Sequence, residues 1–190
     1  AQLLESHRIP VERRTGLGGT LVAFQALSSG EIDAYAEYSG TISQVILNMN
    51  GDSTEGELAA ALAPLGVDLL PRLGFNNTYA LTVTRETAAR YALGSISNLT
   101  DHPELRFGLS HEFRDRPDGW PGFKQAYDLP QDSSGIEHGL AYQALLASEI
   151  DVTDAYSTDG DLLRYDLVVL EDNLEFFPSY LAVLVARTDL

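Results

Sequence analysis

The feature that most constrains this chain is a duplicated stretch. Residues 23–39 read AFQALSSGEIDAYAEYS, residues 141–157 read AYQALLASEIDVTDAYS, and nine of the 17 aligned positions are identical. Chance alone gives about one identity over such a length, so the match indicates a repeated supersecondary unit. A fold that contains this unit twice should have two similar halves.

Each copy predicts a helix, a tight turn and a short strand. Helix-compatible residues run up to Gly30 in the first copy and Ser148 in the second, where the helix should stop. The Ile-Asp pair that follows begins a strand, and Tyr38 or Tyr156 lies just beyond its carboxyl end. Ligands of open α/β sheets bind at the carboxyl ends of strands, so both tyrosines are candidate site residues.

A second, weaker pair consists of two β-prone runs. Residues 77–83 (NTYALTV) and 178–184 (PSYLAVL) are apolar, and each is opened by a tyrosine, Tyr79 or Tyr180. We expect these runs to cross between the two halves. A cleft between the halves would then collect four tyrosines at duplicated positions.

These patterns predict an α/β chain of two lobes, each a sheet flanked by helices. The predicted division is lobe I, residues 1–76 and 182–190, and lobe II, residues 77–181. Further strands are expected over 11–14, 105–109 and 166–170, a helix over 55–62, a loop over 50–53 and a turn over 117–122. Thr20 is expected to cap the helix that runs through Leu27.

Composition narrows the classes of partner. The chain has 12 Lys and Arg against 28 Asp and Glu, a formal net charge of -16, which disfavours binding to nucleic acid or to anionic membrane surfaces. It has no cysteine, and therefore no disulfide, thiolate metal site or cysteine nucleophile. No apolar run approaches about 18 residues, so no segment is expected to span a membrane.

The motifs of common catalytic and cofactor sites are missing. GLGGT at 16–20 lacks the Gly-Lys-Ser/Thr ending of a phosphate loop, and the acidic run 151–161 does not match a calcium loop. The four histidines have no metal-ligand spacing and are expected at the surface or as caps. Ser110-His111-Glu112 is not accompanied by a nucleophile elbow. We therefore expect no metal, no cofactor and no enzymatic activity.

Aromatic side chains are the remaining candidates for binding a ligand. Several aromatic faces around one site can bind a diffuse, weakly hydrated cation such as a trimethylammonium group. The alternative for any one tyrosine is that it packs against a sheet and bonds its hydroxyl locally. Four tyrosines at duplicated positions favour the cage.

At these positions the sequence resembles the substrate-binding proteins of ABC-type osmoprotectant importers, which are receptors for glycine betaine, carnitine, choline or proline betaine. The resemblance covers nearly the whole chain. It rests on GLGGT at 16–20, GEID at 30–33, EYSGT at 37–41, HEF at 111–113, RPDG at 116–119 and DVTDAYSTD at 151–159.

The resemblance implies a type II periplasmic-binding-protein fold that closes around its ligand between two lobes. It assigns the cage to the same four tyrosines, the ligand carboxylate to Thr41 and Arg116, and the flanks of the cationic head to Glu112 and Asn77. An arginine suits a carboxylate because its planar fork donates two hydrogen bonds. The expected ligand-binding set is Tyr38, Thr41, Asn77, Tyr79, Glu112, Arg116, Tyr156 and Tyr180.

The resemblance also implies a monomeric, extracytoplasmic receptor that hands its ligand to a membrane permease. It would be free, lipid-anchored or fused to that permease. The chain opens at Ala1 as if inside a helix, and it lacks the first strand and the C-terminal helices of such receptors. Lobe I is therefore expected to be trimmed at both ends. The alternatives are a receptor for another small zwitterion or amine, an enzyme that acts on a small amine, or a structural fragment with no ligand.

Overall fold

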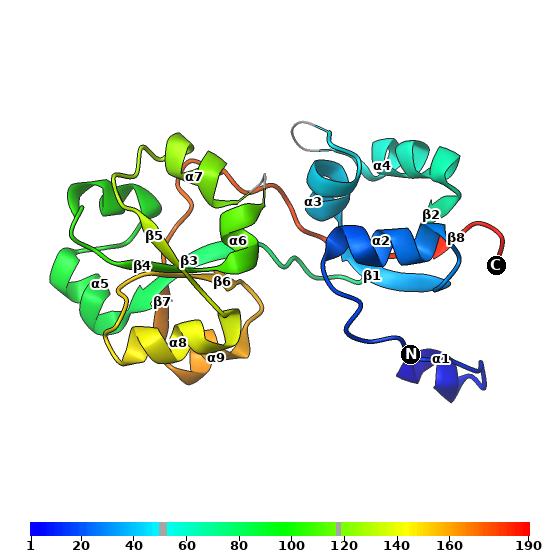
Figure 1. The fold of residues 1–190 in the computed structure, drawn as a ribbon, viewed down its shortest axis with the longest axis horizontal. Helices are drawn as coiled ribbons and strands as arrows, with labels where there is room; N and C mark the ends of the chain where they lie inside the picture. The colour runs from blue at the N-terminus through cyan, green and yellow to red at the C-terminus, as the bar shows by residue number, and fades with distance from the viewer. Residues whose placement is uncertain (50–52, 117–118) are drawn as a thin grey trace.

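The computed structural model describes residues 1–49, 53–116 and 119–190. It consists of two units joined by two extended segments (Figure 1). The first unit contains the strands β1 (Ala34–Tyr38), β2 (Val67–Leu69) and β8 (Ala182–Arg187). The second contains β3 (Tyr79–Thr84), β4 (Phe107–Ser110), β5 (Ser133–Ile136), β6 (Thr153–Tyr156) and β7 (Leu167–Val169).

The first unit is built on an antiparallel sheet of order β1-β8-β2, so its last strand lies at the centre. Its helical segments are α2 (Thr20–Ser28), α3 (Ser39–Thr41), the π-helical η1 (Ile42–Ile46), α4 (Glu55–Leu62) and the 3-10 turn η2 (Ala63–Leu65). A buried cluster joins them to the sheet: Leu27, Ile42, Leu58, Leu62, Val67, Val183 and Val185. A short helix, α1 (Gln2–Ser6), precedes the unit.

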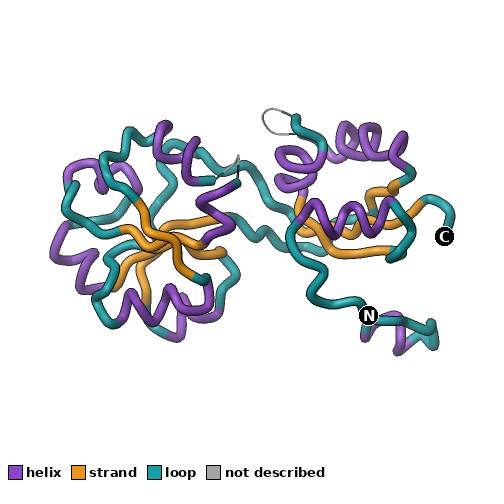
Figure 2. Tube along the Cα trace, viewed as in Figure 1, coloured by secondary structure: helices purple, strands orange, loops and turns teal. Residues whose placement is uncertain are grey.

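The second unit has strands at its centre and helices around them (Figure 2). The order β6-β3-β7 is antiparallel, β4 pairs with β5 in parallel, and a parallel bridge from Phe107 to Val152 connects the two groups. The surrounding helices are α5 (Arg85–Tyr91), η3 (Ile96–Asp101), α6 (His111–Asp115), α7 (Trp120–Ala126), α8 (His138–Leu146) and α9 (Gly160–Arg164).

The repeat predicted from the sequence is confirmed as two helix–turn–strand units, α2 with β1 and α8 with β6. Gly30 and Ser148 follow the helices with φ of 80° and 55°, the left-handed conformation that stops a helix. Tyr38 and Tyr156 are the last residues of their strands, whereas the sequence placed them just beyond.

The expected helix over 55–62 is confirmed as α4. It begins at Glu55 because Thr54 and Glu57 form a capping box there. The strand expected over 105–109 begins two residues later and ends one residue later, and the strand expected over 166–170 is shorter by one residue at each end. The expected loop over 50–53 lies mostly outside the described residues, as does the first part of the turn over 117–122. The rest of that turn is wrong, since Trp120 begins α7 with proline in its first turn.

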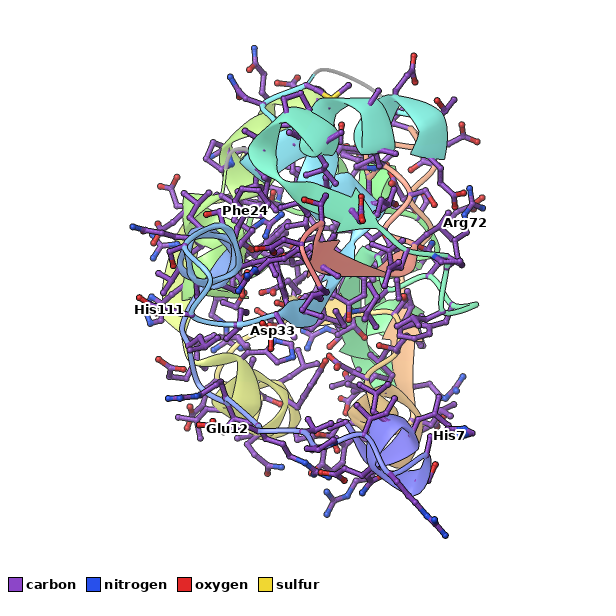
Figure 3. All side chains as sticks on the ribbon, turned by 90° about the vertical axis from the view of Figure 1, so that its right-hand side faces the viewer. His7, Glu12, Phe24, Asp33, Arg72 and His111 are labelled. Atoms are coloured by element: carbon purple, nitrogen blue, oxygen red, sulfur yellow. The ribbon has the colours of Figure 1, made fainter. Side chains whose placement is uncertain are left out.

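Two expectations for the N-terminal region are also wrong. Residues 11–14 form no strand: they lie in an extended, largely exposed segment, and no described strand runs beside them. Figure 3 shows this segment, with His7 and Glu12, below the rest of the unit and away from Phe24. Thr20 is not the cap of α2, because Gly19 holds that position and Thr20 is the first helical residue.

Candidate ligand-binding site

The two extended segments between the units pair with each other. Asn76 and Leu181 form an antiparallel bridge, the Asn77 backbone N–H donates to the Tyr180 carbonyl at 2.9 Å, and the Tyr180 N–H donates to the Asn76 side chain at 2.8 Å. Ser39, after β1, donates from its hydroxyl to the Ser179 carbonyl at 2.8 Å. The crossings therefore form a short two-stranded connection. Tyr180 lies two residues before β8, whereas the sequence placed it at the start of that strand.

One cavity of about 290 Å³ collects all eight residues that the sequence assigned to ligand binding. They come from the first unit, the second unit and the crossings: Tyr38 and Thr41; Tyr79, Glu112, Arg116 and Tyr156; Asn77 and Tyr180. The volume lies just below the roughly 300–1,000 Å³ usual for small-molecule pockets, so the cavity suits a small solute.

The aromatic side chains centre on Tyr79. Its ring centroid lies 5.2 Å from that of Tyr156 and 5.8 Å from that of Tyr180, which it meets edge-on. Tyr79 and Tyr180 are buried, whereas Tyr38 and Tyr156 are half-buried. Burial raises the pKa of the Tyr79 and Tyr156 hydroxyls, so both rings stay neutral at ordinary pH. The cavity therefore combines neutral aromatic surfaces from both units.

A glycine next to the cavity sets the position of one ring. A Cβ atom on Gly40 would lie 2.7 Å and 2.8 Å from two ring carbons of Tyr180, far inside van der Waals contact. Tyr180 is 2% exposed and has little room to move. The approach of Tyr180 to α3 thus requires a residue without a side chain at position 40.

We therefore expect Gly40→Ala to displace Tyr180 and to weaken ligand binding. Overpacking of this kind costs about 1–3 kcal/mol of folding free energy. Gly56→Ala in α4 is the matched control, because a Cβ there meets nothing within 4 Å. Denaturant unfolding measures the folding free energy of both variants, and titration calorimetry measures their ligand affinity. If Gly40→Ala matches Gly56→Ala in both quantities, Tyr180 has room to adjust.

Two charged residues lie beside the rings: Glu112 of α6 and Arg116, which follows that helix. Arg116 lies with a guanidinium nitrogen 3.4 Å from the Glu112 carboxylate, and its guanidinium carbon is 5.6 Å from the Tyr79 ring centroid. The Tyr156 hydroxyl donates to the other Glu112 oxygen at 3.3 Å. A cation thus already lies within the range of about 6 Å in which an aromatic face attracts it.

A buried hydrogen-bond pair holds α6 in this position. Asp154 of β6 accepts from the Ser110 backbone N–H and hydroxyl, both at 2.6 Å, and the Ser110 oxygen accepts from the Phe113 N–H at 3.2 Å. Ser110 therefore caps α6 and ties it to the strand that ends at Tyr156. Burial raises the pKa of the Asp154 carboxyl.

Tyr156 is supported from behind by residues that the sequence did not assign to the site. The His138 ring centroid is 4.9 Å from that of Tyr156, and the Asp159 carboxylate accepts from the Tyr156 N–H at 3.0 Å. The same carboxylate oxygen accepts from the Tyr142 hydroxyl at 2.6 Å and lies 3.0 Å from His138 Nε2. His138, expected at the surface or as a cap, is thus a partly exposed residue at the start of α8 that also borders the site.

Two further residues line the cavity and were missed: Thr20 at the start of α2 and Glu37 in β1. Glu37 is 7% exposed and accepts the Tyr38 backbone N–H at 2.9 Å. Burial raises the pKa of its carboxyl. Both lie inside motifs that had been singled out, GLGGT and EYSGT, but neither residue type points to a ligand by itself.

The polar residues of the crossing are also engaged. The Thr158 hydroxyl donates to the Asn77 side-chain oxygen at 2.6 Å, which ties the first crossing to the turn after β6. Thr41, at the end of α3, is buried.

Within the ranges 1–49, 53–116 and 119–190, no group of three or more His, Asp or Glu side chains could hold a metal ion. No helix in those ranges is long and apolar enough to cross a membrane.

The model of the OpuAC family, described as the substrate binding domain of ABC-type glycine betaine transport systems, matches residues 1–190. The chain belongs to this family. The membership confirms the family suggested by the sequence motifs. The two-lobed α/β fold of type II periplasmic binding proteins is confirmed as well.

Two curated OpuAC-type relatives are similar over nearly the whole chain. The ergothioneine transport permease/ergothioneine binding protein EgtU of Helicobacter pylori (strain G27) is 33% identical over 197 residues, which is 99% of this chain and 35% of that protein. The carnitine transport binding protein OpuCC of Listeria monocytogenes serotype 1/2a (strain 10403S) is 32% identical over 194 residues, 96% of this chain and 62% of that protein. The chain thus spans about a third of EgtU and less than two thirds of OpuCC.

A solved structure described as a glycine betaine/carnitine/choline ABC transporter superposes with a TM-score of 0.74 at 31% identity. The match covers 98% of this chain and 72% of that one. These OpuAC-type relatives are substrate-binding transport proteins rather than enzymes.

Proposed function

We propose that this domain captures a small solute with a trimethylammonium group and presents it to an ABC permease. The observation that supports the proposal most strongly is the convergence of four tyrosines on one cavity, drawn from both units and from the crossing between them. Rings contributed by both units can surround a ligand when the units approach each other. Each aromatic face contributes about 0.5–2 kcal/mol to the binding of a cation.

In this proposal the residues divide into three groups. Tyr38, Tyr79, Tyr156 and Tyr180 form the cage for the methyl groups. Glu112 and Asn77 flank the cationic head. Thr41 and Arg116 bind a carboxylate when the ligand has one, as an arginine fork does well.

The named ligands of the relatives support the trimethylammonium group as the common element. Ergothioneine, carnitine and glycine betaine each combine it with a carboxylate, and choline combines it with a hydroxyl. These molecules differ in the rest of their structure. A site built from aromatic faces recognises the group they share and leaves selectivity to the polar residues around it.

The proposed setting is extracytoplasmic, where a receptor of an importer meets its solute, and the proposed partner is the permease of the same transport system. We propose a monomer, since two units of one chain suffice to enclose the cavity. The division of the chain into lobes at 76/77 and 181/182 stays a prediction.

Calorimetry with Tyr156→Ala tests the cage. This variant should bind choline or glycine betaine about 1–2 kcal/mol more weakly than the unchanged domain, which corresponds to roughly 5- to 30-fold. Tyr156→Phe is the matched control. It loses the hydrogen bond to Glu112 but keeps the aromatic ring, so its loss of affinity should be smaller. If Tyr156→Ala binds as well as the unchanged domain, the cage is assigned to the wrong residues.

A further inference from the structure

A second cavity, which we call the side groove, adjoins the cage. Its volume is about 460 Å³, and Thr20, Glu112 and Arg116 line it as well as the cage. Figure 1 shows α6 on the side of the second unit that faces α2 and α3, so the side groove lies between the two units, as the cage does. Its other lining residues are Gly19, Leu21, Val22, Val45, His111 and Asp115.

The wall that the first unit contributes to the side groove is apolar. Leu21 and Val22 are 60% and 52% exposed in the first turn of α2, and Val45 of η1 is half-buried. None of these three side chains is a member of the buried cluster that joins α2 and η1 to the sheet. Exposed apolar side chains that gather in a hollow are one mark of a ligand-binding groove.

The sequence repeat shows that the first unit does not need Leu21 to form its helix. Extended upstream from residues 23 and 141, the alignment of the two copies places Gly139 opposite Leu21. The helix α8 forms with this glycine in its first turn. The exposed Leu21 side chain is therefore not explained by the helix–turn–strand unit itself.

The polar residues of the side groove lie at its border with the cage and along α6. Glu112 and Arg116 are 3.4 Å apart at the border. A ligand whose head group lay among the tyrosines would pass this pair with its middle part and reach Leu21 and Val22 with its far end. Contact with those side chains stabilises the complex only if the far end is apolar.

We propose that the side groove binds a hydrocarbon tail attached to a quaternary-ammonium head group that is held in the cage. The inference rests on the proposed function and adds a class of ligand, quaternary-ammonium compounds with an apolar tail, which are larger than glycine betaine or choline. Each methylene group that is buried should raise the affinity about fourfold. Because both units contribute walls, an approach of the units would enclose the tail together with the head group.

Titration calorimetry with tetramethylammonium, butyltrimethylammonium and hexyltrimethylammonium tests the side groove, since these cations share a head group and differ only in chain length. Affinity should rise with chain length, and hexyltrimethylammonium should bind at least roughly tenfold more tightly than tetramethylammonium. Equal affinities for the three cations would overturn the inference and leave the cage in place. If none of the three binds, the proposed function fails, and the inference fails with it.

Leu21→Ser removes part of the apolar wall and leaves the tyrosines unchanged. It should lower the affinity for hexyltrimethylammonium roughly fivefold and leave the affinity for tetramethylammonium unchanged. Leu140→Ser in α8 is the matched control, because Leu140 is also 60% exposed and is not among the residues that line either cavity. It should leave both affinities unchanged.

Two results with these variants would contradict the inference. If Leu21→Ser weakens both cations equally, Leu21 packs against α6 when the units approach and does not contact a tail. If Leu21→Ser and Leu140→Ser have the same effect, the hydrocarbon chain binds elsewhere on the surface. Should Leu21→Ser fail to fold, Val22→Ser at the neighbouring position of the side groove takes its place, with the same expected results.

Discussion

Replacing Arg116 by alanine should weaken glycine betaine by about 1.5–3 kcal/mol, roughly 10- to 150-fold, because hydrogen bonds to a charged group are lost. Choline has no carboxylate, so its affinity should stay the same or rise. A rise is expected if Arg116 competes with the ligand for the Tyr79 face, over which its guanidinium carbon lies at 5.6 Å. Isothermal calorimetry with both ligands measures the difference.

The control is Arg164→Ala in α9, which removes the same charge from an exposed position paired with Asp161 at 3.5 Å. It should leave both affinities unchanged. The unfolding temperature of Arg116→Ala must be measured as well, because this side chain is only 11% exposed and contacts Glu112. Equal losses for choline and glycine betaine would assign Arg116 to the support of α6 rather than to the ligand carboxylate.

Replacing Leu81 by alanine should destabilise the second unit by about 2–5 kcal/mol, the range for large-to-small changes in a core. Leu81 is 0% exposed and lies in β3, between β6 and β7, within the same buried cluster as Trp120. Trp120 is the only tryptophan of the chain, so its fluorescence during urea unfolding reports on this unit.

Leu163→Ala is the control for this measurement. Leu163 is 90% exposed in α9, and changes at such positions are usually within about 0.5 kcal/mol. A Leu81→Ala variant that unfolds at the same urea concentration as Leu163→Ala would mean that the core around β3 closes over the lost volume.

Much of the fold and of the site could be predicted from local pattern. The helix–turn–strand repeat was visible because identical residues recur in the same order, and the same order produces the same local structure. The helix over 55–62 was predicted from its helix-forming residues, and the structure adds a capping box at its start. The eight expected ligand residues were found in one cavity because they belong to motifs at strand ends and crossings, where such folds converge. Their role in binding stays a prediction.

What local pattern could not predict depends on neighbours that are distant in sequence. Residues 11–14 look like a strand, but a strand forms only where another strand offers its backbone, and none of the described ones does so there. Glutamate is usually exposed to solvent, yet Glu37 lies in β1, which pairs with β8, and its carboxyl is buried beside the cavity. His138 was expected at the surface or as a cap, and its place against the Tyr156 ring depends on the packing of α8 beside β6.

The sequence by itself therefore determined the repeated units and which aromatic residues end them, since both depend on residues within a few positions of one another. Only the tertiary structure decided which charges share the cavity with those aromatic residues. Burial and electrostatic attraction depend on distances through space, and Glu37, Glu112 and Arg116 face the same cavity from two units that meet only in the folded chain.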